Sequence, residues 1–141
     1  MAQFSIELYQ QIGGRVICVS CWDQEDQTSY TFRRMAGVDP DELVRIADRF
    51  GGIDKAKAKA LGYEVLPGDA WLAEPAEILI PAALENQVRA DNAPRIHAKV
   101  KLFAEGAAEE AAVRAAVVEA ERLRADVRLV HLVAHMKTRE L

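Results

Sequence analysis

Residues 15–20, RVICVS, indicate the fold class most strongly, because this short run is apolar and rich in β-branched side chains. Such near-continuous apolar character is typical of a strand that is buried on both faces, as in a parallel sheet. Residues 77–81, EILIP, have the same character, and residues 100–103, VKLF, are a third short candidate strand. We therefore expect a parallel sheet in which Ile17 and Ile80 are buried.

Helical patterns lie between these candidate strands. Residues 4–12 and 40–50 place apolar side chains at spacings of three and four, which is the periodicity of an amphipathic helix. Asp39 stands where an N-cap is expected, and Asp54 stands at the start of a further helix over residues 54–61. Strands that alternate with helices favour an α/β fold with a parallel sheet flanked by helices.

The remaining segments are less regular. Residues 21–37 are polar and form either a small hairpin or an excursion at the sheet edge, and residues 62–76 form a connection. Short helical turns are expected at residues 82–87 and 92–97. From Gly106 onward the pattern predicts a C-terminal helical segment, whose last helix carries apolar residues at Val127, Val130, Leu132 and Val133.

Composition excludes several classes of function. The net charge is −4 and acidic and basic residues are interleaved, so no nucleic-acid partner is expected. No apolar run reaches the roughly 18 residues of a membrane span, and the first residues lack the pattern of a signal peptide. Cys18 and Cys21 are expected to be reduced thiols in a cytoplasmic protein. They supply only two of the four ligands that zinc requires, so no metal site is expected.

Three segments together resemble a known family. They are GGRVICVSCWD at residues 13–23, EILIPAALENQV at residues 77–88 and NAPRIHAKVKLFAEGA at residues 92–107. In this order and at these spacings they resemble the C-terminal, dinucleotide-binding domain of the glutamate, leucine, phenylalanine and valine dehydrogenases. The resemblance covers about residues 3–107 and is closest to the glutamate dehydrogenases.

This resemblance implies an NAD- or NADP-dependent oxidoreductase that deaminates L-glutamate to 2-oxoglutarate and ammonia. It implies a partial Rossmann-like, dinucleotide-binding domain over residues 1–106. Separately from the resemblance, we expect C-terminal helices over residues 107–141 that pack on this domain. The partners it implies are the dinucleotide and either further copies of the chain or other dehydrogenase subunits. The alternative is a non-catalytic α/β assembly or interaction module derived from the family.

The cofactor of a doubly wound sheet lies outside the carboxyl ends of its strands. Ser20 and Asp23 follow the first candidate strand here, and Asp23 is either the carboxylate that binds the adenosine ribose or a loop charge. Arg33 and Arg34 either hold a 2′-phosphate or are a solvated pair. The sequence therefore leaves the choice between NAD and NADP open.

The nicotinamide side of the cofactor site is implied by the second and third segments. Ala82 and Ala83 are small enough for close approach of a dinucleotide, or they serve tight packing of a helix on the sheet. Asn86 matches a family residue near the nicotinamide ribose, although it can also cap a short helix. Gly106 belongs to a loop near the nicotinamide, but Ala108 stands where the family usually has asparagine.

Two departures from the family limit the expected activity. Counting back from Gly13, the last glycine of the phosphate-binding fingerprint falls near Ala2, and the earlier ones would stand before Met1. We therefore expect the chain to be truncated before its glycine-rich loop and to bind NAD weakly. The family's catalytic lysine and aspartate belong to a separate substrate domain that no segment here resembles. We nominate no catalytic residue, and we interpret Lys55, Lys57 and Lys59 as a solvated face.

Overall fold

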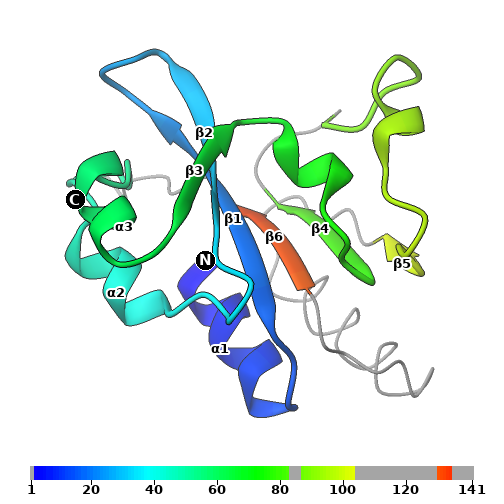
Figure 1. The fold of residues 1–141 in the computed structure, drawn as a ribbon, viewed down its shortest axis with the longest axis horizontal. Helices are drawn as coiled ribbons and strands as arrows, with labels where there is room; N and C mark the ends of the chain where they lie inside the picture. The colour runs from blue at the N-terminus through cyan, green and yellow to red at the C-terminus, as the bar shows by residue number, and fades with distance from the viewer. Residues whose placement is uncertain (1, 83–86, 104–129, 135–141) are drawn as a thin grey trace.

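The structure is a computed structural model that describes residues 2–82, 87–103 and 130–134 of the chain (Figure 1). Helices and strands alternate along the described chain. In chain order the elements are α1 (Ala2–Gln11), β1 (Val16–Asp23), β2 (Thr28–Arg33), α2 (Pro40–Arg45), α3 (Lys55–Ala60), β3 (Glu64–Pro67), η1 (Ala70–Ala73), β4 (Ile78–Ala82), η2 (Ala93–Arg95), β5 (Leu102–Phe103) and β6 (Val130–Ala134).

These strands form one mixed sheet in the order β3-β2-β1-β6-β4-β5. Neighbours are parallel from β1 through β6 and β4 to β5, whereas β1 pairs with β2, and β2 with β3, in antiparallel fashion. The expected parallel sheet is therefore extended at one end by two antiparallel strands. Residues 24–27 form a turn between β1 and β2, which is far too short for the crossover that a parallel pair requires.

The polar segment after the first strand is a hairpin, one of the two expected alternatives. Asp23 of β1 lies opposite Thr28 of β2, and the pairing continues back to Cys18 opposite Arg33. Gln27 closes the turn with a positive φ of 52°. The connection expected over residues 62–76 then adds a third antiparallel strand, β3, and the short helix η1.

The helices largely follow their local signals. Asp54 caps α3 by accepting a hydrogen bond from the Lys57 amide, as its position predicts. The helix expected over residues 40–50 stops at Arg45, because the chain turns back on itself after it. The Asp48 carboxylate accepts hydrogen bonds from the amides of Phe50 and Gly52, and this local turn replaces the expected last helical turn.

The largest correction concerns the C-terminal segment. Residues 130–134 form the strand β6 and not the last helix expected there. Periodicity alone does not separate a short apolar run in a strand from one in a helix. Here the run is paired on both sides, to β1 and to β4, so long-range backbone pairing decides its conformation. Residues 104–129 and 135–141, where the other C-terminal helices were expected, lie outside the described residues, as do residues 83–86.

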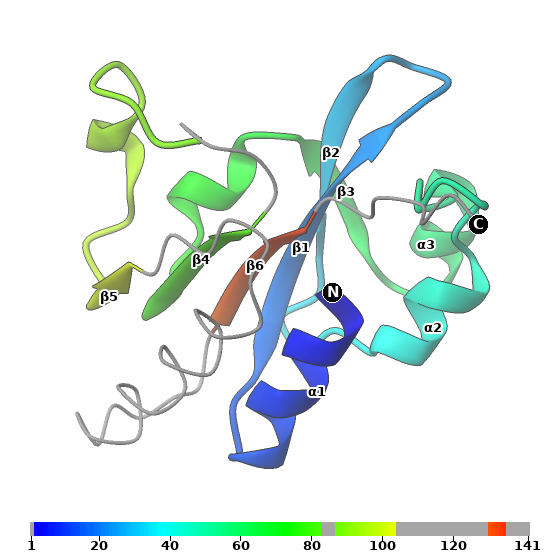
Figure 2. The ribbon, with the colours of Figure 1, turned by 180° about the vertical axis from the view of Figure 1, so that it is seen from behind.

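The sheet carries a hydrophobic core on each face. Figure 2 shows α1, α2 and α3 together on one side of it, and their buried side chains pack with Val19, Phe32 and Ile80. The other face buries Ile17, Trp71 and Leu72 with neighbouring apolar groups. Ile17 is 0% and Ile80 1% exposed, which confirms the expected burial. No helix among the described residues has the length and apolar character to cross a membrane.

We predict that Ile80→Ala lowers the free energy of unfolding by about 2–5 kcal/mol, because it removes buried methyl groups and leaves a cavity. Val44 is 43% exposed on α2, so Val44→Ala should change the stability by less than about 0.5 kcal/mol. Urea denaturation followed by circular dichroism measures both. Equal stability of the two variants would contradict the assignment of Ile80 to the core.

Candidate functional site

The candidate site lies at the sheet edge where the parallel strands end. In an open α/β sheet, ligands bind in the crevice outside the carboxyl ends of the strands. Asp23 ends β1, Ala82 ends β4, and β6 ends between them at Ala134. Parallel pairing of β6 with both neighbours brings these three strand ends to one edge (Figure 1).

Asp23 is a buried carboxylate whose two oxygens are both occupied. Its Oδ1 accepts hydrogen bonds from the amides of Glu25 and Asp26, each at 2.9 Å, and so closes the hairpin turn. Its Oδ2 accepts a hydrogen bond from Lys55 Nζ at 2.5 Å. This hydrogen bond from Lys55 holds the pKa of Asp23 below its ordinary value. Asp23 therefore stays ionised and joins the turn to α3.

Lys55 is the centre of this charge cluster. Its ammonium also donates to Asp26 Oδ2 at 2.8 Å and lies 4.8 Å from the centre of the Tyr30 ring. The Tyr30 hydroxyl donates to the same Asp26 carboxylate at 2.6 Å. The hydrogen bonds to Asp23 and Asp26 raise the pKa of Lys55. The Lys55 ammonium therefore contacts Asp23, Asp26 and the Tyr30 ring within the chain, and it carries its charge throughout the neutral range.

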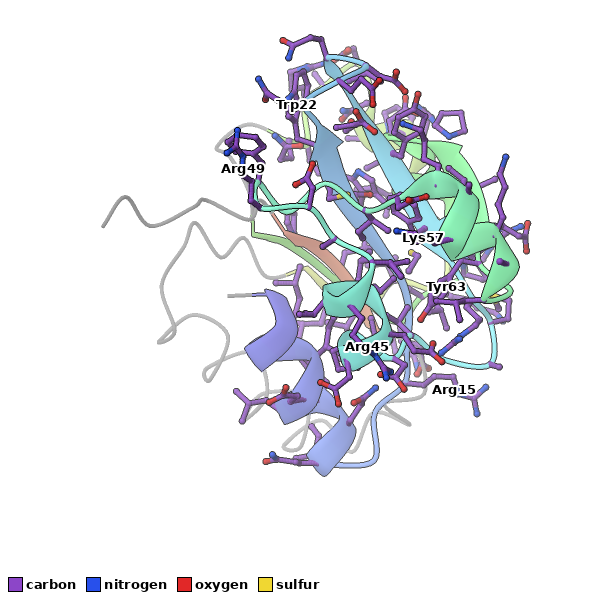
Figure 3. All side chains as sticks on the ribbon, turned by 90° about the vertical axis from the view of Figure 1, so that its left-hand side faces the viewer. Arg15, Trp22, Arg45, Arg49, Lys57 and Tyr63 are labelled. Atoms are coloured by element: carbon purple, nitrogen blue, oxygen red, sulfur yellow. The ribbon has the colours of Figure 1, made fainter. Side chains whose placement is uncertain are left out.

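The sequence interpretation missed this role of Lys55. Lys57, two residues further along α3, fits the expected solvated face: its side chain is 67% exposed and pairs with Asp54 at 3.4 Å (Figure 3). The Lys55 side chain is only 33% exposed. The difference depends on the β1–β2 turn, which meets the first turn of α3 from 29 to 32 residues away in sequence. No local pattern around Lys55 contains that information.

Ser20 lies on the opposite face of the sheet from Asp23. Side chains of a strand alternate between its faces, so residues three apart point to opposite sides. Ser20 Oγ is 2.6 Å from Thr31 Oγ1 and 3.4 Å from the carbonyl oxygen of Gly68, and the residue is 3% exposed. It fixes the turn after β3, and the fold does not bring it together with Asp23.

Arg33 and Arg34 are both held in internal ion pairs. Arg33 forms one ion pair with Glu64 at 2.5 Å and another with Glu74 at 2.9 Å. Glu74 is 4% exposed. Arg34 pairs with Glu42 at 2.7 Å. Neither of the alternatives that the sequence left open describes them, because they are neither a solvated pair nor free to hold a 2′-phosphate.

The nicotinamide side of the expected site is only partly described. Ala82 is the last residue of β4 and pairs through its backbone with Ala134 of β6. Ala83, Asn86 and Gly106 lie outside the described residues. Their roles remain predictions of the resemblance.

A cavity of about 690 Å³ lies beside Asp23, between the hairpin turn, the loop after α2 and the start of α3. Arg45 and Lys57 line it together with Glu25 and Asp48, so its charge is balanced. Figure 3 shows Trp22 at the same end of β1, and this residue is 39% exposed. Within residues 2–82, 87–103 and 130–134, no cluster of histidine, cysteine or carboxylate side chains could hold a metal ion.

The two cysteines are buried and form no disulfide. Burial raises the pKa of the Cys21 thiol to about 11, and burial together with Glu74 raises the pKa of Cys18 well above its ordinary value. Both side chains are therefore neutral thiols at physiological pH, and a low pKa, the usual mark of a reactive cysteine, is absent from both.

Comparison with known proteins identifies a family for this sequence. The sequence model of the Glutamate/Leucine/Phenylalanine/Valine dehydrogenases matches residues 1–122. The chain belongs to this family. The match includes the three segments on which the resemblance rests. None of the curated proteins compared with the chain matches it.

We predict that Asp23→Asn destabilises the protein at pH 7 by about 1 kcal/mol, the upper end for partly exposed ion pairs. Because the folded state lowers the pKa of Asp23, its stabilising effect is present above the ordinary carboxyl value of 3.8 and is lost as pH falls through the lowered pKa. Urea denaturation at several pH values should show the variant and the wild type converging in acid.

Glu25→Gln is the matched control, because it removes one carboxylate charge two residues along the chain, at an exposed position of the turn. We expect it to leave the stability at pH 7 within about 0.5 kcal/mol of the wild type. If Asp23→Asn were as stable as Glu25→Gln at pH 7, the Lys55–Asp23 contact would not hold the turn against α3.

Proposed function

We propose that this chain is the dinucleotide-binding domain of an NAD- or NADP-dependent amino-acid dehydrogenase whose substrate is L-glutamate. Membership of the family supports the reaction class, which is oxidative deamination to a 2-oxo acid and ammonia. The stretch EILIPAALENQV, residues 77–88, supports the glutamate branch. The partners that we propose are the dinucleotide and further dehydrogenase subunits.

The order of the parallel strands is the observation that carries this proposal. A Rossmann domain has the strand order 3-2-1-4-5-6, with its ligand at the carboxyl ends of the central strands. By position in the sheet, the parallel run β1-β6-β4-β5 resembles the second, first, fourth and fifth strands of that order, although β6 is the last described strand of the chain and not the first. On this correspondence Asp23 stands at the end of the second strand, where an acidic residue binds the adenosine ribose.

The described residues do not fit a dinucleotide at this ribose position. A ribose hydroxyl needs a carboxylate oxygen that is free to accept its hydrogen bond, and both oxygens of Asp23 have partners. Ser20 is buried on the other face of the sheet, and the nearby arginines are engaged. We therefore expect the chain by itself to bind either dinucleotide weakly.

Because both oxygens of the Asp23 carboxylate already accept hydrogen bonds, this contact also favours the alternative function, a non-catalytic α/β assembly or interaction module derived from the family. In that case Lys55 would serve only the fold, and its removal would expose no latent site. If the domain is a cofactor domain held closed at the ribose position, the removal of Lys55 should instead make Asp23 available. The two functions are therefore distinguished by one substitution.

We predict that the wild-type chain shows no saturable binding of NAD up to millimolar concentration in isothermal titration calorimetry. Lys55→Ala should bring NAD binding into the measurable range by freeing Asp23 Oδ2. NADP should not gain in the same way, because its 2′-phosphate would meet an uncompensated carboxylate. Lys57→Ala is the matched control, since it removes a lysine of the same helix that does not contact Asp23, and it should behave as the wild type.

Two results would change the proposal. Micromolar binding of NAD by the wild type, abolished by Asp23→Asn, would make Asp23 a ribose ligand and our interpretation of its contacts wrong. Failure of both the wild type and Lys55→Ala to bind either dinucleotide would favour the non-catalytic module.

We also predict that the purified chain does not reduce NAD or NADP with glutamate as substrate. The resemblance assigns the catalytic lysine and aspartate to a separate substrate domain, and no segment of this chain resembles it. The absorbance of the reduced nicotinamide measures the reaction. Turnover by a preparation that is free of host dehydrogenases would contradict the prediction.

A further inference from the structure

Residues 46–54, here called the tip loop, connect α2 to α3 and are closed at their base. Ala47 pairs with Ile53 in an antiparallel bridge. The Asp48 amide donates a hydrogen bond to the carbonyl oxygen of Gly52 at 2.8 Å, and the Asp48 carboxylate accepts one from the Gly52 amide. Ile53 is 6% exposed and belongs to the core under the helices. The tip loop is therefore anchored at its base and held in one conformation by its own hydrogen bonds.

The tip loop presents an aromatic and a cationic side chain to solvent. Phe50 is 46% exposed, the largest exposure among the large hydrophobic residues of the described chain. The Arg49 guanidinium lies 4.6 Å from the centre of the Phe50 ring, and Arg49 forms no ion pair with a described residue. Aromatic residues and arginine are enriched at the cores of protein interfaces, and a rigid loop loses little conformational entropy on binding. The tip loop therefore has the features of a contact surface.

A cavity of about 650 Å³ on the same side of the sheet carries the opposite charge. It lies between the end of α1, the start of β1 and the start of α2, and we call it the acidic cavity. Its lining contains the carboxylates of Glu7, Asp39 and Asp41 but only one cation, Arg15. The Arg15 guanidinium donates to a backbone carbonyl at 3.5 Å. The end of α1 adds the negative pole of a helix dipole, so the acidic cavity favours a cationic occupant.

The tip loop and the acidic cavity lie at the two ends of α2. Asp39 and Asp41 stand at the start of this helix, and the tip loop follows its last residue, Arg45. Between the two ends Val44 is 43% exposed. This surface is self-complementary: when α2 is placed antiparallel to α2 of a second copy, each basic end meets an acidic end, with an apolar residue between them.

We propose that two copies of this chain form a two-fold symmetric dimer in which each tip loop docks into the acidic cavity of the other copy. Arg49 of one copy then lies beside Glu7 and Asp41 of the second, and Val44 lies near the axis. A two-fold axis makes both contacts equal, which is the commonest symmetry of soluble oligomers. A cavity of this volume takes groups larger than one side chain.

The tip loop cannot enter the acidic cavity of its own chain. The six residues of α2, a length of about 9 Å, separate the two surfaces, and the base of the tip loop is tied to the core. Figure 3 shows Arg49 and Arg15 well apart, at the upper left and the lower right of the molecule. Neither Asp23 nor Lys55 takes part in the dimer, so it does not depend on dinucleotide binding and either inference can fail alone.

Sedimentation velocity of the full chain from micromolar to millimolar concentration tests the proposal. We expect the wild type to pass from monomer to dimer. Salt should weaken the dimer, because the screening length falls from about 10 Å at 0.1 M to about 3 Å at 1 M. Arg49→Ala and Asp41→Arg should each weaken it at least tenfold, while circular dichroism confirms that both variants fold. Lys59→Ala is the matched control, because it removes an exposed cation of α3 outside both surfaces, and it should associate as the wild type does.

A mixture of the two weakened variants separates a lost contact from a lost fold. Arg49→Ala keeps an intact acidic cavity, and Asp41→Arg keeps an intact tip loop. Each variant alone has no complete contact, whereas the mixed dimer has one of the two. The mixture should therefore associate more tightly than either variant alone. A mixture that associates no better than its components would overturn the proposal.

Crosslinking tests the position of the axis. In the variant Val44→Cys, a short bismaleimide should join two copies, since one thiol adds across each maleimide double bond and no group leaves. The native cysteines are buried, so they do not compete. Leu61→Cys is the matched control, because it places a thiol at a residue that is 38% exposed at the end of α3, away from the axis. Equal crosslinking of the two variants, or a wild type that stays monomeric at millimolar concentration, would overturn the proposal.

Discussion

Pairing of β1 on both of its edges is the constraint on which the structure depends. One edge pairs with β2 through a short turn, and the other pairs with β6, which comes from the far end of the chain. Both faces of β1 are covered as well, by Val19 and Cys21 on one side and Ile17 and Cys18 on the other. A register shift between Val16 and Cys18 places Ile17 and Cys18 in the same core. A strand enclosed on four sides has one position and one register, so its neighbours are positioned by it.

The elements of the fold that the sequence predicts are those with local causes. The apolar runs at residues 15–20 and 77–81 become β1 and β4, because the side chains of a buried strand are enough to identify it. Asp54 begins α3 because a short side chain at the N-cap satisfies an amide three residues on. The strand β6 has no such local cause. Its run of five residues fits a helix or a strand, and the choice is made by two partner strands more than 45 residues away in sequence.

The sequence likewise predicts only some features of the candidate site. The resemblance predicts a site at the carboxyl ends of the parallel strands, and this location stays a prediction. It did not determine which side chains are available there. Asp23 is at the expected place, yet the charge of Lys55 satisfies it, and this pairing follows from how α3 meets the hairpin. Ser20 is also close to this edge in sequence, but its side chain lies on the opposite face of the sheet from Asp23, because side chains alternate along a strand. Whether a polar group is free to bind a ligand depends on its tertiary contacts. The residues of a binding site are therefore harder to predict from sequence than its position.

The ionic cluster around Lys55 and the strand β6 both contact β1, which links the site to the fold. Lys55 holds the carboxyl end of β1 through Asp23, and β6 holds its middle through the ladder from Val16 to Ser20. Substitutions at sites that share partners or a backbone shift are often not additive in their effect on stability. Loss of β6 would leave β1 an edge strand, on which the Lys55–Asp23 contact would then hold the hairpin alone. Conversely, the removal of Lys55 loosens only the turn while the ladder persists. Removal of the Lys55–Asp23 contact therefore leaves the β1–β6 ladder intact, whereas loss of β6 would leave one edge of β1 unpaired.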